Sequence, residues 1–125
     1  MSTQHGPTFA NGKICYMEIP ALDIEQSAAF YHDIFGWEIR RREDGSVSFD
    51  DSVCEVSGGW VTGREPHTQL GLCISLMVKD IETTMQLITG NGGTILEPVG
   101  KDLPAITALF SDPAGNIFSL YQHSF

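Results

Sequence analysis

The sequence of 125 residues lacks the features that mark several large classes of protein. It has only three cysteines, Cys15, Cys54 and Cys73, and no CxxC pair, which argues against a disulfide scaffold and against a zinc knuckle. No apolar run approaches the roughly 20 residues that span a bilayer. Residues 1–13 contain no apolar signal-peptide core. We therefore expect reduced thiols and a cytoplasmic location.

Basic residues are also scarce. Seven lysines and arginines stand against sixteen aspartates and glutamates, which gives a formal net charge of −9. So acidic a chain repels phosphate backbones and anionic lipid, so we expect neither a nucleic-acid partner nor a membrane partner. The sequence has no P-loop, no GxGxxG after a strand and no GxSxG. Nucleotide binding and serine hydrolysis therefore lack support.

What the sequence does contain is an internal repeat. Residues 18–39 match residues 75–96 at a constant offset, so that Asp23 corresponds to Asp80, 57 residues later. A match at fixed offset over a strand–helix–strand unit indicates a duplicated module. We therefore predict two similar halves that share one core, within a single domain of residues 1–125.

Each half is predicted to run β-α-β-β-β. Asp23 and Asp80 are good helix N-caps, and Gly36 is placed to end the first helix. The expected elements are strands at 13–19, 37–42, 46–49, 53–56, 70–78, 94–96, 105–110 and 116–122, with helices at 24–35 and 81–89. Module one spans about 13–60, a glycine-containing connector spans 61–69, and module two spans 70–122.

Two stretches resemble a known family. Residues 18–39, with the pattern FY…FGW, and residues 109–122, with DPAGN, are similar to the vicinal oxygen chelate superfamily. This superfamily includes glyoxalases, bleomycin- and fosfomycin-resistance proteins and extradiol dioxygenases. The resemblance implies an α+β fold of two βαβββ modules, in which an open, eight-stranded, barrel-like sheet surrounds one pocket. It also implies a homodimer, which would cover the exposed sheet edges.

In metal-dependent members of the family, a divalent ion sits in that pocket and acts as a Lewis acid. Its ligands come from the first and last strands of each module. The matching positions here are Tyr16, Cys73 and Ser119, with Glu55 or Thr62 as the fourth. A phenol with a pKa of about 10 is a poor ligand at neutral pH, and this set is not the hard O/N set of Ni²⁺, Fe²⁺ or Mn²⁺ chemistry. We expect no metal and no other cofactor. A divalent metal with atypical ligands stays open as an alternative.

The cavity-lining positions follow from strand alternation and from the resemblance together. Tyr16 and Glu18 share one face of the first strand, and the repeat places Cys73 and Ser75 at the matching positions. The residues expected to contact a ligand are Tyr16, Glu18, Trp60, Cys73, Ser75, Ser119 and Tyr121. If the protein is catalytic, Glu18 is the candidate general base and Tyr16 the hydrogen-bond donor. The alternatives are that Glu18 is solvated or paired with an arginine, and that Trp60 packs in the core.

Three functions are consistent with these residues. The first is a glyoxalase/bleomycin-resistance-like module that binds a small metabolite or drug in a central cavity without the usual metal. The second is a lyase, isomerase or dioxygenase-type enzyme of the same superfamily, either metal-independent or with atypical ligands. The third is a structural or partner-binding subunit whose pocket is filled by its own side chains.

Overall fold

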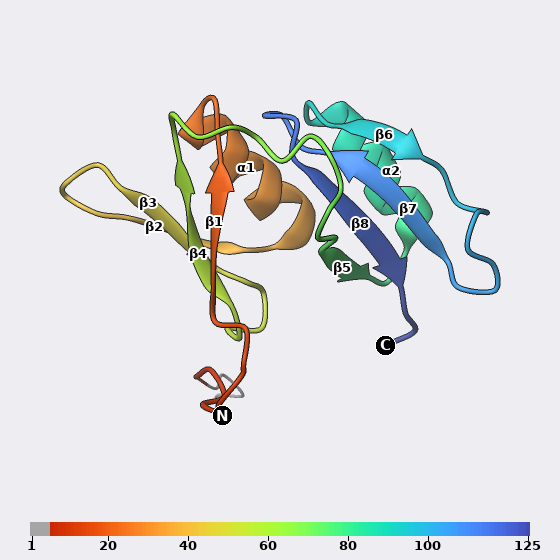
Figure 1. Cartoon of the computed structure of the whole chain (residues 1–125), viewed down its shortest axis with the longest axis horizontal. Helices are drawn as coiled ribbons and strands as arrows, with labels where there is room; N and C mark the ends of the chain where they lie inside the picture. Colours follow the sequence, from red (N-terminus) through yellow and green to blue (C-terminus); the bar gives the residue numbers. More distant parts are fainter. Residues whose placement is uncertain (1–5) are drawn as a thin grey trace.

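The computed structural model describes residues 6–125 and shows two consecutive βαβββ units (Figure 1). The first unit comprises β1 (Tyr16–Pro20), α1 (Ile24–Phe35), β2 (Glu38–Arg41), β3 (Val47–Asp50) and β4 (Ser57–Val61). The second comprises β5 (Ser75–Val78), α2 (Ile81–Gly90), β6 (Thr94–Glu97), β7 (Thr107–Ser111) and β8 (Ile117–Gln122). The α+β class and the duplicated module predicted from the repeat are confirmed.

Each unit forms its own four-stranded sheet. The strand orders are β1-β4-β3-β2 and β5-β8-β7-β6, and the first-listed pair of each sheet is parallel while the others are antiparallel. Over residues 6–125 no ladder joins the two sheets, and they are not closed into a barrel. The eight strands expected in one open sheet therefore lie in two four-stranded sheets. β1 and β5 are edge strands, and in the single chain neither pairs across the junction.

The helix ends match the prediction closely. The Asp23 carboxylate accepts a hydrogen bond from the backbone N–H of Gln26 at 3.1 Å, and Asp80 accepts one from Thr83 at 3.1 Å. Gly36 ends α1 in the left-handed region, with φ of 73°. A glycine adopts this conformation without the Cβ clash that other residues suffer.

The last strand of module one was misplaced in the sequence analysis. Residues 53–56 were expected to be a strand, but they form turns, and β4 begins at Ser57 and runs through Gly58 and Gly59. Glycine weakens isolated strands, so the Gly58-Gly59 pair carries no local strand signal. In the structure, a Cβ on Gly58 would lie 2.2 Å from the Met17 carbonyl oxygen and 2.4 Å from the Phe49 ring. Gly58 is therefore required by close packing inside the sheet.

One aromatic core joins the two units. Tyr31 of α1 is fully buried and stacks on Trp37, with ring centroids 4.6 Å apart. The same ring meets Phe118 of β8 edge-on at 5.9 Å, and Phe30 lies 6.2 Å from Phe110 of β7. Helix α1 thus packs against both sheets, and Figure 1 shows it between them.

A buried polar cluster completes this junction. The Tyr31 hydroxyl donates to the Asp112 carboxylate at 2.7 Å, and the Asn116 side-chain amide donates to Asp112 at 3.0 Å and to the Pro20 carbonyl at 2.7 Å. The Asn116 side-chain oxygen in turn accepts from the backbone N–H of His67. Tyr31 belongs to the FY motif, and Asp112 and Asn116 belong to the DPAGN motif. The two stretches that carry the family resemblance therefore contact each other.

The pKa of Tyr31 is raised well above its ordinary value, first by desolvation on burial and then by the neighbouring Asp112. Because the pKa is raised in the folded state, the protonated Tyr31 phenol stabilises the fold. This stabilisation is complete below about pH 10, the pKa of an exposed tyrosine. It is lost as the pH rises towards the folded-state pKa.

We expect Tyr31→Phe to lower the free energy of unfolding at pH 7 by about 1–3 kcal/mol, because Asp112 loses a buried donor. The variant should also lose less stability than the wild type between pH 9 and about pH 11, since no phenol remains to ionise. Urea unfolding across this pH range measures both effects. Tyr16→Phe, at an exposed tyrosine, is the control. A wild-type-like pH profile in Tyr31→Phe would contradict this account.

We expect Gly58→Ala to destabilise the fold by about 3 kcal/mol or more, because the new methyl group would overlap backbone and ring atoms in the sheet. Gly90→Ala is the matched control, since a Cβ there meets nothing within 4 Å. Thermal melting should show a large drop for the first variant and no drop for the second. Equal melting temperatures would show that β4 does not approach Met17 and Phe49 as described.

Candidate functional site

Each sheet has one face turned to the aromatic core and one turned away from it. In the first sheet, Ile19, Phe49 and Trp60 point to the core. Side chains alternate along a strand, so the remaining positions form the opposite surface, which we call outer face one. The ladder registers place on it Tyr16, Glu18, Glu38, Arg40, Ser48, Asp50, Ser57, Gly59 and Val61.

The second sheet repeats this arrangement. Phe110 and Leu120 are fully buried against the core. The surface turned away from them, outer face two, is defined by the registers of β5, β7 and β8. It carries Ser75, Met77, Thr107, Leu109, Ser111, Ile117, Ser119 and Tyr121. Hydroxyl groups and apolar side chains are therefore mixed on this face.

The predicted site residues fall into two separate sets. Tyr16 and Glu18 lie on outer face one. Ser75 and Ser119 are directly paired on outer face two, Tyr121 follows beside them, and Cys73 is exposed just before β5. Among residues 6–125, no hydrogen bond or ion pair joins one set to the other. The predicted site residues thus form two separate groups, and the strong exposure of Tyr16, at 56%, and of Met77, at 60%, shows that both faces are open to solvent.

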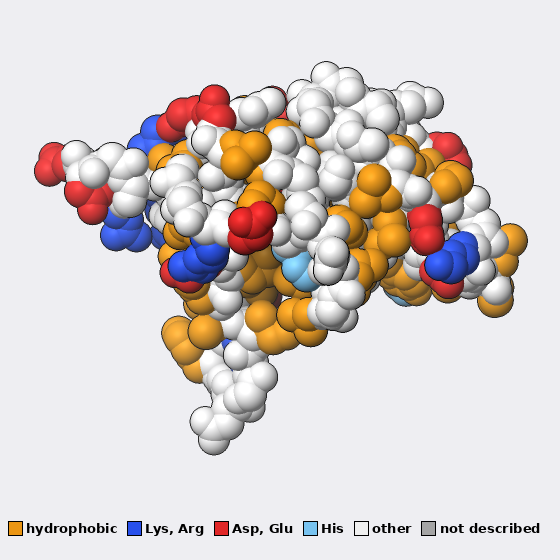
Figure 2. Space-filling model, turned by 45° about the horizontal axis from the view of Figure 1, so that its top comes forward, with side chains coloured by type: hydrophobic (Ala, Val, Ile, Leu, Met, Phe, Trp, Pro, Cys, Tyr) orange, Lys and Arg blue, Asp and Glu red, His pale blue; other side chains and the backbone are white. Residues whose placement is uncertain are grey.

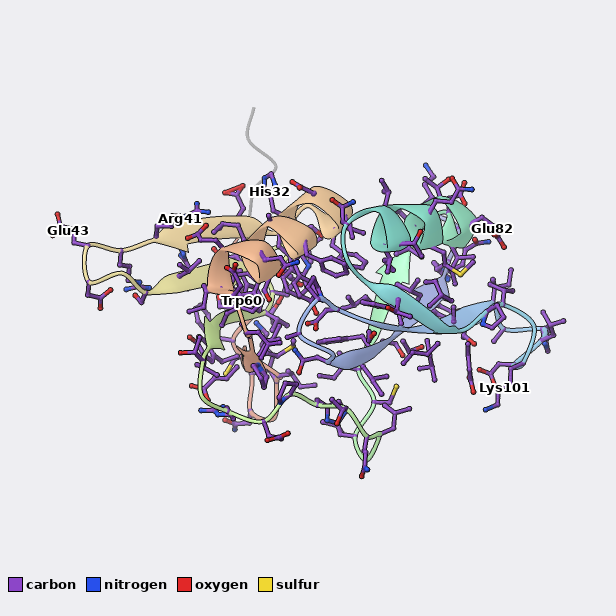
Figure 3. All side chains as sticks on the ribbon, turned by 90° about the horizontal axis from the view of Figure 1, so that it is seen from above. His32, Arg41, Glu43, Trp60, Glu82 and Lys101 are labelled. Atoms are coloured by element: carbon purple, nitrogen blue, oxygen red, sulfur yellow. The ribbon has the colours of Figure 1, made fainter. Side chains whose placement is uncertain are left out.

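Trp60 does not join either set. Its register with Ile19 turns it to the core, where it is 4% exposed and packs 4.9 Å from the Phe49 ring and 6.0 Å from the Tyr31 ring. Figure 3 shows it lying close to α1. Trp60 was expected to wall a ligand, and the structure instead confirms the alternative of core packing.

Glu18 is held in an ion pair. Its carboxylate lies 2.8 Å from the guanidinium of Arg64, and both side chains are about half exposed. The pairing with an arginine, which the sequence left open, is confirmed. The Glu18 carboxylate is thus already bound to a cation and open to solvent, which does not favour a role as general base.

Outer face one also holds a polar network that the sequence analysis missed. The Asp50 carboxylate accepts from the Ser57 hydroxyl at 2.6 Å and from the Arg40 guanidinium at 2.9 Å. Arg40 belongs to a run of three arginines, 40–42, and Ser57 lies just beyond the strand predicted at 53–56. Correct placement of β4 would have revealed the network, because it puts Ser57 opposite Asp50.

The registers settle which residue of module one matches Ser119. Glu18 and Ser75 are equivalent by the repeat, Ser75 pairs with Ser119, and Glu18 pairs with Gly59. Gly59 is therefore the equivalent of Ser119, so the two candidates taken from the sequence, Glu55 and Thr62, were wrong. The constant offset failed because the loop between the second and third strands of the module is longer in module two, at 98–106, than in module one, at 42–46.

Glu55 lies before β4 and has other partners. Its carboxylate accepts from the Thr8 hydroxyl at 3.0 Å and pairs with Lys13 at 3.3 Å. A hollow of about 670 Å³ lies there, between residues 7–11 and the beginnings of β1 and β4. It contains none of the predicted ligand-contacting residues.

The four positions that hold metal in relatives are therefore Tyr16, Gly59, Cys73 and Ser119. They offer a phenol, no side chain, a thiol and a hydroxyl, which do not fit the imidazole and carboxylate set that divalent ions of this class prefer. In the described part of the chain, no three His, Cys, Asp or Glu side chains lie close enough together to hold an ion. We derive no chemistry through a metal.

A smaller hollow of about 290 Å³ lies between the two units. Its lining is mostly apolar and includes Met17, Ile74 and Phe118, with Glu18 and His67 at its margin. Figure 2 shows hydrophobic side chains at the surface between the two halves of the molecule. The hollow runs beside the β1 edge, next to outer face one.

Comparison with family models decides the family. Residues 16–121 match the model described as a glyoxalase-like domain. The chain belongs to this family. It is thereby a member of the vicinal oxygen chelate superfamily, as the FY…FGW and DPAGN stretches indicated. No helix among residues 6–125 has the length and apolar character needed to cross a membrane.

Individual relatives agree with this assignment. A glyoxylase-like domain-containing protein of Didymella fabae is 29% identical over 120 residues, covering 88% of this chain and 93% of the relative. A glyoxalase/bleomycin resistance protein/dioxygenase superfamily member from Sphaerobacter thermophilus has a TM-score of 0.71 at 23% identity, covering 90% and 98%. TnmS3, an antibiotic-binding protein from Streptomyces sp. CB03234, has a TM-score of 0.69 at 20% identity, covering 94% and 100%. The two structures share the fold of this chain.

Proposed function

We propose that this glyoxalase-like protein binds a small molecule, as a sequestering or sensing module, and does so without a metal. The cavity forms when outer face one of one copy meets outer face two of a second copy. The observation that carries this proposal is that the predicted ligand-contacting residues, Trp60 excepted, form two open half-sites within the single chain. One half-site holds Tyr16, and the other holds Ser75 and Ser119.

The exposed edges support the homodimer. β1 and β5 each form one of the two edges of their sheets, and unpaired edges of this kind are normally covered in native proteins. Large apolar side chains stand exposed on or beside the two faces, among them Tyr16, Leu72 and Met77. Because the modules are repeats of each other, a dimer with one two-fold axis would contain two equivalent contacts. Each contact would join module one of one copy to module two of the other.

The chemistry of the two faces supports a small-molecule ligand. Tyr16 and Tyr121 offer aromatic surface with a polar tip, and Ser75 and Ser119 add hydroxyl groups that can donate or accept. A few polar groups on a largely apolar surface are typical of ligand cavities. That one protein of the same fold is described as antibiotic-binding is consistent with this class of ligand.

A second candidate function is a metal-independent lyase or isomerase. Tyr16 and Glu18 lie two residues apart on the same face, so both would line the proposed cavity. In this reading Glu18 is the base and Tyr16 the hydrogen-bond donor, and Arg64 must release Glu18 when substrate binds. Turnover that Glu18→Gln abolishes, with ligand affinity retained, would favour the enzyme over the binding module.

We expect a mass of twice 13.7 kDa in solution at micromolar concentration, from light scattering after gel filtration. Met77→Glu should weaken the dimer, because it places a charge on an apolar part of outer face two. Leu87→Glu is the control, since Leu87 is an exposed residue of α2 on neither outer face. A wild-type monomer, or equal weakening by both variants, would reject the arrangement.

Ligands should raise the melting temperature of the wild type by mass action when the protein is screened against metabolites and antibiotics. Tyr16→Ala should reduce the shift caused by any compound that binds, because it removes aromatic surface from the cavity. The protein screened should be purified without chelator and analysed for metals. Finding one tightly bound Ni, Zn, Fe or Mn ion per chain, absent from the Cys73→Ser variant, would contradict the proposal that the protein binds its ligand without a metal.

A further inference from the structure

Outer face one contains a buried hydroxyl group with no partner. Ser48 is 9% exposed, and its Oγ makes no hydrogen bond within the described chain. Leaving a buried hydroxyl unpaired costs free energy, so such groups in native proteins call for an explanation. The register turns Ser48 to outer face one, directly opposite Gly59.

Because Gly59 has no side chain, the Tyr16 hydroxyl can lie close to the backbone opposite Ser48. A Cβ on Gly59 would lie 3.3 Å from the Tyr16 hydroxyl oxygen and 3.3 Å from the Val47 carbonyl oxygen. The Tyr16 hydroxyl therefore lies over Gly59, the residue that pairs with Ser48. In an antiparallel pair such as Ser48 and Gly59, the two Cβ positions lie roughly 5 Å apart. We call Tyr16, Ser48 and Gly59 the Gly59 niche.

Charges around the niche disfavour an ionic occupant. Glu18 is paired with Arg64, and Arg40 is paired with Asp50. The register places Glu38 on the same face, so the charges there sum to a slight negative excess. An anion would be repelled, and any ion would lose hydration beside the buried Ser48 without a dedicated counter-charge.

We propose that the Gly59 niche receives an uncharged oxygen or amide group of the ligand, while a ring in the ligand lies against Tyr16. The Ser48 and Tyr16 hydroxyls can each donate or accept, so together they suit a neutral carbonyl, alcohol or carboxamide. Tyr16 is exposed and can rotate to admit the group. This inference rests on the proposed function only in placing the niche within the ligand cavity.

The test uses benzamide as the probe, with toluene and benzoate as comparators, titrated into ¹⁵N-labelled full-length protein. Benzamide should shift the backbone amide signals of Ser48 and Gly59. Toluene, which lacks the polar group, and benzoate, which is anionic, should bind more weakly. Failure of benzamide to shift these signals, or equal affinity for benzoate, would overturn the proposal.

Two variants separate ligand recognition from a structural role. Ser48→Ala should leave the melting temperature unchanged or raised, because it removes an unpaired buried hydroxyl, yet weaken benzamide roughly 3- to 10-fold through the lost hydrogen bond. Gly59→Ala should fill the niche and weaken benzamide at least as much, while Gly90→Ala should bind normally. A lowered melting temperature in Ser48→Ala, or unchanged benzamide affinity, would overturn the niche.

These outcomes are independent of the wider function. If benzamide shifts the Ser48 and Gly59 amide signals in a protein that is monomeric, the niche is supported and the shared cavity is rejected. If compounds bind the dimer, and bind Ser48→Ala with the same affinity as the wild type, the shared cavity is supported and the niche is rejected.

Discussion

The structure depends on one buried carboxylate. Asp112 lies in the turn between β7 and β8, is 3% exposed, and is surrounded by donors from Tyr31, Asn116 and the backbone of its own turn. Through Asn116 the same cluster holds the end of β1 and the connector. A buried charge is tolerated only when its hydrogen bonds are complete. The cluster therefore fixes how the two modules sit, and with them the directions of both outer faces.

The elements that could be predicted from the sequence were those with local signals. Helix α1 has a capping Asp23, an apolar stripe and a terminal Gly36, and each of these acts within a few residues. β4 could not be predicted, because Gly58 is explained only by its packing against Met17 of β1 and Phe49 of β3, which no local pattern reveals. Separation of the eight strands into two sheets was equally out of reach, since it depends on how α1 packs between them.

The residues of the candidate site likewise divide into those that local patterns predicted and those that depend on contacts distant in the sequence. Alternation along β1 correctly put Tyr16 and Glu18 on one face, and the repeat correctly carried this to Ser75. The repeat failed at the last strand, because the loop between the second and third strands differs in length, and so it pointed to Glu55 and Thr62 instead of Gly59. The Ser48 hydroxyl gave no signal at all, because a lone serine in a short strand is unremarkable until its neighbours are known.

The glycine at position 59 also determines where the Tyr16 ring can lie. Its counterpart in the duplicate module, Ser119, bears a side chain, whereas any side chain introduced at 59 would meet the Tyr16 phenol at once. A side chain at position 59 therefore requires the Tyr16 ring to turn away from β4. Positions 16 and 59 are thus coupled, because the orientation open to the Tyr16 ring depends on whether residue 59 carries a side chain.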